Sequence, residues 1–182
     1  MVILESLFDA FCAFLDGKLR WSTRETSAKA WTETIFSFFS EENQKQHVPY
    51  LEEREYLRLD YIWRNDLSHY SSSDIQLAVE HENVTETLEK LLDSEIQHLI
   101  DVKATNKIGI FYVNEGDESQ FVDGVGKRIR AQHMRFSYER YLVIIGRTTR
   151  QERRLAIRYK GYFFDAEGLV TRQTEHVIAQ AP

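Results

Sequence analysis

Cysteine and proline are scarce in this chain of 182 residues, which contains one cysteine and two prolines. The single cysteine, Cys12, excludes an intramolecular disulfide and a metal site built from several thiolates, and it fits a reducing, cytoplasmic setting. No run of eighteen apolar residues occurs, so the sequence predicts no membrane-spanning helix. The apolar stretch at residues 2–15 lacks a basic leader and is interrupted by acidic side chains, which argues against a secretory signal peptide.

Enough apolar residues are present for one good core, since 42% of the chain is hydrophobic and 13% is aromatic. At this length the composition favours a single domain spanning residues 1–182. Within it we expect N-terminal helices in residues 1–40, a core carrying the acidic motifs in residues 54–113, and a helix followed by basic C-terminal strands in residues 117–182.

The spacing of apolar residues predicts alternating helices and strands. Capping signals favour helix starts at Ser22, which has Glu25 three residues later, and at Asn83, which is followed by Glu86. Helical spacing is found in residues 2–15, 22–39, 84–102 and 118–134, and strand-like runs occupy residues 55–63, 75–82, 107–113, 141–145 and 155–159. A hairpin followed by helix, strand, helix and strands predicts an α/β or α+β fold, with a central mixed sheet flanked by helices.

Three carboxylates lie on the less apolar faces of the two strands of the expected hairpin. Asp60 lies on the less apolar face of residues 55–63 together with Arg58, and Glu80 and Glu82 share the less apolar face of residues 75–82. A symmetric turn around residues 66–74 places Asp60 opposite Glu80, on the same side of the sheet. Carboxylates that close repel one another unless a cation lies between them, and hard oxygen ligands suit magnesium, manganese or calcium. The alternative is an exposed strand face whose acids pair with arginines.

Asp60 followed by Glu80-His81-Glu82 resembles the acidic motifs of the PD-(D/E)XK nuclease superfamily, across residues 33–113. The resemblance implies a restriction-endonuclease-like core and metal-dependent hydrolysis of phosphodiester bonds, with DNA as the substrate. It implies that Asp60 and Glu80 hold Mg²⁺ or Mn²⁺. It also suggests a further acidic ligand on the preceding helix, for which Glu33 is the first candidate, ahead of Glu25 and Glu53.

One departure from that family concerns Glu82, which stands where the family usually has lysine. The lysine helps to activate water and to stabilise charge in the transition state. Some restriction enzymes are similar to this chain in having glutamate there, so Glu82 is the candidate base. Lys90, on the following helix, or Lys107 could supply the missing cation, although Lys90 could instead pair with Glu86 on the helix surface.

Positive charge is concentrated in the C-terminal part of a chain whose net charge is -6. Residues 126–160 contain eleven Lys or Arg residues, densest in an expected loop at residues 147–154. The candidate nucleic-acid contacts are Arg58, Arg147, Arg150, Arg153 and Arg154. A solvated basic face that balances an acidic N-terminal part is the alternative explanation.

Other sites are weaker candidates. The histidines have no metal-ligand spacing such as His-x-x-x-His, and His81 alternates toward the buried face, as expected for a hydrogen-bonded core histidine. The aromatic residues Trp31, Phe36, Phe38 and Phe39 form either core or a homodimer surface. A non-catalytic module that binds nucleic acid or protein on the same scaffold, without the lysine, is the alternative to a nuclease.

Overall fold

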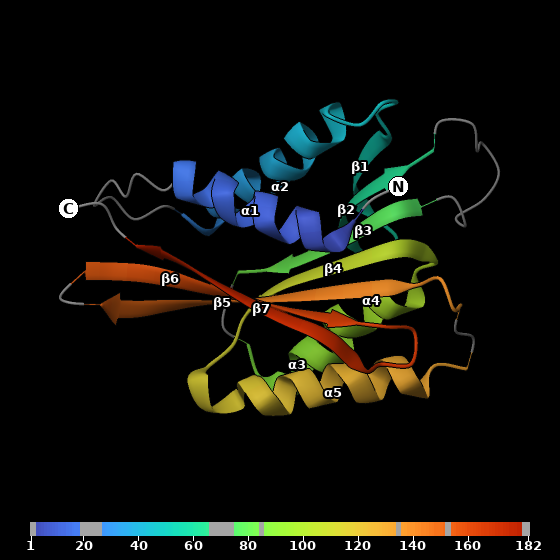
Figure 1. Ribbon diagram of the computed structural model, residues 1–182. Helices are drawn as coiled ribbons and strands as arrows, with labels where there is room; N and C mark the ends of the chain where they lie inside the picture. The colour runs from blue at the N-terminus through green and yellow to red at the C-terminus, as the bar shows by residue number, and fades with distance from the viewer. Residues whose placement is uncertain are drawn as a thin grey trace.

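A seven-stranded sheet lies at the centre of the molecule, between two layers of helices (Figure 1). The computed structural model describes residues 3–18, 27–65, 75–83, 86–133, 136–151 and 154–179. The order of strands across the sheet follows their order in the sequence. This arrangement confirms the predicted class, a central mixed sheet flanked by helices.

The strands are β1 Leu51–Tyr56, β2 Leu59–Arg64, β3 Ile75–Glu82, β4 Ala104–Tyr112, β5 Arg140–Gln151, β6 Arg154–Phe164 and β7 Val170–Ala179. The pairs β1–β2 and β2–β3 are antiparallel, the pairs β3–β4 and β4–β5 are parallel, and the pairs β5–β6 and β6–β7 are again antiparallel. Parallel neighbours require crossover connections, and helices supply both of them here. The carboxyl ends of β3, β4 and β5 therefore meet on one side of the molecule.

Helices cover both faces of the sheet. α1 (Leu4–Lys18) and α2 (Ala28–Gln44) lie on one face, while α3 (Leu88–Lys90), the π-helix η2 (Leu91–Ile96), α4 (Gln97–Asp101) and α5 (Glu118–Ala131) lie on the other (Figure 1). A short 3₁₀ turn, η3 (Glu115–Asp117), precedes α5. The crossover from β3 to β4 is thus a helix with a π-helical centre. In the described part of the chain, no helix is long and apolar enough to cross a membrane.

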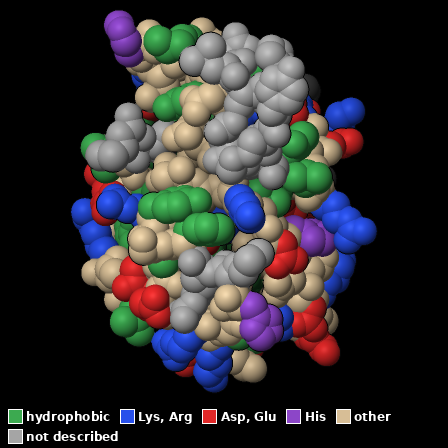
Figure 2. Space-filling view, turned by 90° about the vertical axis from the view of Figure 1, so that its right-hand side faces the viewer, with side chains coloured by type: hydrophobic (Ala, Val, Ile, Leu, Met, Phe, Trp, Pro, Cys, Tyr) green, Lys and Arg blue, Asp and Glu red, His purple; other side chains and the backbone are tan. Residues whose placement is uncertain are grey.

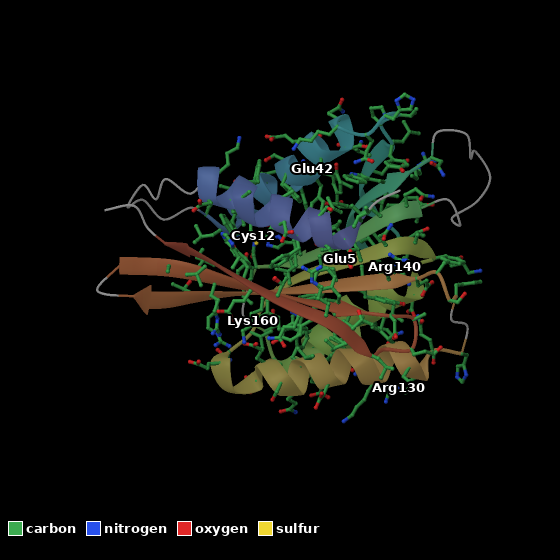
Figure 3. The ribbon with its side chains drawn as sticks, in the orientation of Figure 1. Glu5, Cys12, Glu42, Arg130, Arg140 and Lys160 are labelled. Atoms are coloured by element: carbon green, nitrogen blue, oxygen red, sulfur yellow. The ribbon has the colours of Figure 1, made fainter. Side chains whose placement is uncertain are left out.

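Apolar side chains fill the space on each side of the sheet. The cluster under α1 and α2 contains Phe36, Phe38 and Phe39, so these aromatic residues belong to the core. Cys12 is buried in the same layer, on α1 (Figure 3), where burial raises the pKa of its thiol to about 12. Its role as a packing residue, as the helical pattern predicts, fits that environment.

The first two strands form a hairpin that the sequence pattern does not reveal. The chain reverses at Leu57 and Arg58, whose φ angles are 51° and 70°, so the prediction of one strand through residues 55–63 is wrong. A two-residue turn with both φ angles positive usually contains asparagine or glycine, and neither is present here. Arg58 is consequently an exposed turn residue and does not share a strand face with Asp60.

The sequence predicts helix starts at Asn83 and at Ser22, and neither of these residues caps a described helix. Asn83 donates from Nδ2 to Ala28 O at 2.8 Å, which ties the end of β3 to α2, and the cap of the following helix is Thr87. The prediction of a cap at Asn83 is therefore wrong. The predicted capping box at Ser22 lies outside the described residues, and the described start of α2 is capped by Ser27.

Candidate functional site

Asp60 and Glu80 lie opposite each other on neighbouring strands. The register pairs Tyr61 with Val79, which makes Asp60 and Glu80 the next opposed pair, as the symmetric hairpin predicts. The backbone N–H of His81 donates to Asp60 Oδ2 at 2.7 Å. This bond holds the Asp60 carboxylate against β3, so the strand register fixes its position beside Glu80.

Glu80 is a buried carboxyl group with acidic neighbours. Its exposed fraction is 4%, and its Oε2 has no hydrogen-bond partner among the described residues. Burial raises the pKa of Glu80 to about 10, and a hydrogen bond with Glu95 of η2 and the charge of Asp60 add to the shift. An acid in this position is costly to ionise without a counter-charge.

Asp60 belongs to the same acidic group and is half-buried. Burial raises its pKa, the hydrogen bond from His81 opposes that shift, and the charges of Glu95 and Glu82 raise the pKa further. Four carboxylates from β2, β3 and η2 therefore act on one another. Glu82, at the end of β3, is half-buried too, so the group extends from a buried carboxyl to the surface.

Two members of this site were missed by the sequence reasoning. Glu95 and His98 come from the helix that follows β3, and together with Glu80 they place ligand atoms within 4.8 Å of one another. The sequence pattern that could have revealed them is an acid and a histidine three residues apart, on the helix directly after Glu80-His81-Glu82. This spacing puts both side chains on one face of a helix.

The residues present fit a divalent cation. The ligand atoms that lie within 4.8 Å of one another come from Glu80, Glu95 and His98, and Asp60 stands beside this group as a further carboxylate without belonging to it. Carboxylate oxygens are the hard ligands that Mg²⁺ and Mn²⁺ take, and Glu80 Oε2 is a buried oxygen without a partner among the described residues. A bound cation would relieve the repulsion between the acids.

Glu33, the predicted third ligand, is not brought to this site. It lies on α2 and accepts hydrogen bonds from Arg54 at 2.9 and 3.0 Å. Of the other two candidates, Glu53 pairs with Arg64 on the neighbouring strand, and Glu25 lies outside the described residues.

Of the two candidate lysines, only Lys90 lies near the acids. Its ammonium group contacts Glu86 at 2.6 Å, as an i,i+4 pair. That hydrogen bond raises the pKa of Lys90, and the charges of Glu82 and Glu95 raise it further. The Lys90 side chain is about half exposed.

Lys107 is fully buried and already engaged. Its ammonium lies 3.2 Å from the Glu139 carboxylate and donates to Ile100 O at 3.0 Å and to the Tyr141 hydroxyl at 3.2 Å. Burial lowers its pKa, and the charge of Glu139 opposes that shift. These partners hold Lys107 in a structural role.

His81 points to the opposite side of β3 from Glu80, into the aromatic layer under α2. Its ring contacts Phe36 and Tyr112 edge-on, and neither ring nitrogen has a partner among the described residues. Burial lowers its pKa to about 4. The prediction of a buried histidine is confirmed, while the expected hydrogen bond is not found.

The basic segment is a strand hairpin. β5 continues through Gln151 and β6 begins at Arg154, so the prediction of a loop over residues 147–154 is wrong. The backbones of Arg150 and Arg154 pair at the ends of β5 and β6, but their side chains are outside the described part of the structure. Arg153 lies outside the described residues altogether. The apolar pattern of the flanking segments is too short to reveal such an extended hairpin.

Arg147 belongs to a network around Glu118, the first residue of α5. Its guanidinium lies 2.9 Å from Glu118, and Lys160 (Figure 3) donates to the same carboxylate at 2.8 Å. Burial alone would raise the pKa of Glu118, but hydrogen bonds from Lys160 and Tyr162 and the nearby cations lower it. Arg147 thus stabilises the start of α5.

The opposite end of the molecule, away from the carboxyl ends of β3 and β4, is shown in Figure 2. There the Lys and Arg side chains are interspersed with Asp and Glu. This face has the mixed charge of an ordinary solvated surface.

Comparison with known proteins gives no match: no family model, no curated protein and no solved structure is similar to this chain.

Proposed function

We propose that this protein is a metal-dependent nuclease that hydrolyses phosphodiester bonds in DNA. The observation that carries the proposal is the opposed pair of Asp60 and Glu80, in which Glu80 is buried beside a second acid and has an oxygen with no partner among the described residues. Such a pair is stable at neutral pH when a cation neutralises it.

The placement of the acids supports the proposal. Asp60 lies at the start of β2, and Glu80 and Glu82 lie at the end of the adjacent β3, which is followed by a helical crossover to the parallel β4. The resemblance to the PD-(D/E)XK superfamily likewise implies acids on two adjacent strands, although in that family the first acid ends its strand and Asp60 lies near the start of β2. The observed placement also puts the acids at the carboxyl end of a parallel strand, where open α/β sheets commonly bind ligands.

Each residue has a distinct role in this scheme. Asp60 and Glu80 hold Mg²⁺ or Mn²⁺, and the ion, when bound, would lower the pKa of water and neutralise charge on the phosphodiester. Glu82, nearer the surface, accepts the proton of the attacking water. Lys90 supplies positive charge to the phosphate in place of the usual lysine, after leaving Glu86.

A cleavage assay tests the proposal. Wild type and Asp60→Asn are incubated with single-stranded and duplex DNA, with Mg²⁺ or Mn²⁺ and with chelator. We expect cutting by wild type that requires the ion and that falls at least about a hundredfold in the variant, which lacks one ligand charge. Glu33→Gln is the matched control, because Glu33 pairs with Arg54 away from the site, and it should cut as wild type does.

The contrary result is a folded wild type that cuts none of these substrates with either ion. If such a protein still binds DNA, the non-catalytic module is the better account. Equal cutting by wild type and Asp60→Asn would place the activity elsewhere.

A further inference from the structure

The helical crossover lies over the acidic pair and contributes its own ligand-type side chains. Glu95 is in η2, and His98 follows three residues later in α4. One carboxylate oxygen from each of Glu80 and Glu95 and one imidazole nitrogen of His98 lie within 4.8 Å of one another. Ligand atoms from a strand and from a helix thus surround a common point.

Two polar atoms of these three residues have no partner within the described part of the chain. Glu80 Oε2 is buried on a residue with an exposed fraction of 4%, and His98 Nδ1 is buried as well. Buried polar atoms in native proteins are nearly always satisfied, and a bound ion is one of the standard explanations when no protein group satisfies them. Both atoms are of types that coordinate metal ions.

The backbone at this point is also unusual. Six residues, Leu91–Ile96, form a π-helix between the short helices α3 and α4. π-Helical turns are rare and occur frequently at functional sites, because the widened turn changes the direction of side chains relative to a regular helix. Glu95 belongs to this turn, and His98 follows it by less than one further turn.

We propose that Glu95 and His98 complete the coordination of the ion held by Asp60 and Glu80, and that the imidazole makes the centre selective for Mn²⁺ over Mg²⁺. Mg²⁺ takes oxygen ligands and keeps much of its water, whereas imidazole nitrogen suits first-row transition ions. The inference rests on the metal site of the proposed function, but it does not depend on cleavage.

Calorimetric titration of the metal-free protein with Mn²⁺ and with Mg²⁺ tests this selectivity. We expect wild type to bind Mn²⁺ at least about tenfold more tightly than Mg²⁺. Glu95→Gln and His98→Gln should each weaken Mn²⁺ binding by about tenfold to a hundredfold, and His98→Gln should narrow the ratio between the two ions. Asp101→Asn, an exposed acid on the same helix, is the matched control and should bind as wild type does.

Pulsed electron paramagnetic resonance of the Mn²⁺ complex provides a second readout that does not rely on affinity. A ¹⁴N modulation in wild type that is absent in His98→Gln would establish the imidazole ligand. Two results would overturn this inference and leave the proposed function standing. One is Mn²⁺ binding by wild type without ¹⁴N modulation, and the other is an unchanged Mn²⁺ affinity in both Glu95→Gln and His98→Gln. If wild type binds neither ion, the inference and the proposed metal site fail together.

Discussion

Replacement of Glu80 by glutamine is expected to raise the free energy of unfolding of the metal-free protein by about 3 kcal/mol at pH 7. Glutamine has the same shape, can still accept and donate hydrogen bonds beside Glu95, and carries no charge to bury. The wild-type carboxyl has a pKa of about 10 in the folded protein, against 4.5 for the free side chain. It must therefore bind a proton on folding at neutral pH.

The pH dependence follows from the direction of this shift. Because the folded pKa is higher than the unfolded one, the contribution of Glu80 to stability is fully present below pH 4.5 and is lost as pH rises toward 10. The difference in the free energy of unfolding between Glu80→Gln and wild type should accordingly be small at pH 4.5. It should grow by about 1.4 kcal/mol for each pH unit above that value.

Urea denaturation of both proteins at several pH values, in the presence of chelator, measures the difference. Glu89→Gln, an exposed glutamate on α3, is the control and should leave stability nearly unchanged. Added Mn²⁺ should stabilise wild type, since a ligand bound only by the folded state favours it, and should have little effect on Glu80→Gln. A variant that is less stable than wild type at pH 7 would contradict this account of Glu80.

Substitution of Lys107 by methionine is expected to destabilise the protein by about 3–5 kcal/mol, because it leaves Glu139 buried without its counter-charge. Both side chains are almost completely buried, with exposed fractions of 0% and 4%. Removal of the second charge should reverse most of the loss. In the double variant Lys107→Met/Glu139→Gln, the amide oxygen can still accept the hydrogen bond from the Tyr141 hydroxyl.

The comparison of single and double variants by chemical denaturation separates charge from packing. A double variant no more stable than Lys107→Met alone would show that packing, rather than the unpaired carboxylate, causes the loss. The cleavage assay on the double variant adds a functional readout. Retained cutting is expected for a structural lysine, whereas loss of cutting in a well-folded double variant would make Lys107 a candidate catalytic cation.

The sequence was sufficient to predict the acidic pair, because strand alternation and hairpin symmetry are local rules. Asp60 and Glu80 follow from the period of two along each strand and from a turn centred between them. The helices and the buried strand β4 were also predictable, since their apolar periodicity is strong. The α+β class follows from the order of these elements.

The parts that were missed depend on tertiary contacts or on unusual backbone. The turn at Leu57 and Arg58 uses positive φ angles without glycine or asparagine, and β7 is largely exposed, so its apolar alternation is weak. Glu95 and His98 reach Glu80 only through the packing of the crossover against the sheet. Their helical spacing alone does not show which face of the helix meets β3.

The most direct test of the metal site is a crystal structure of the protein soaked with Mn²⁺, with anomalous diffraction data collected near the manganese edge. We expect a single strong anomalous peak between the carboxylates of Asp60 and Glu80, and no such peak in crystals of Asp60→Asn. The contrary result is a well-ordered wild-type site with no anomalous peak at millimolar Mn²⁺, in which Glu80 is protonated and hydrogen-bonded to Glu95. That result would contradict a metal site at Asp60 and Glu80.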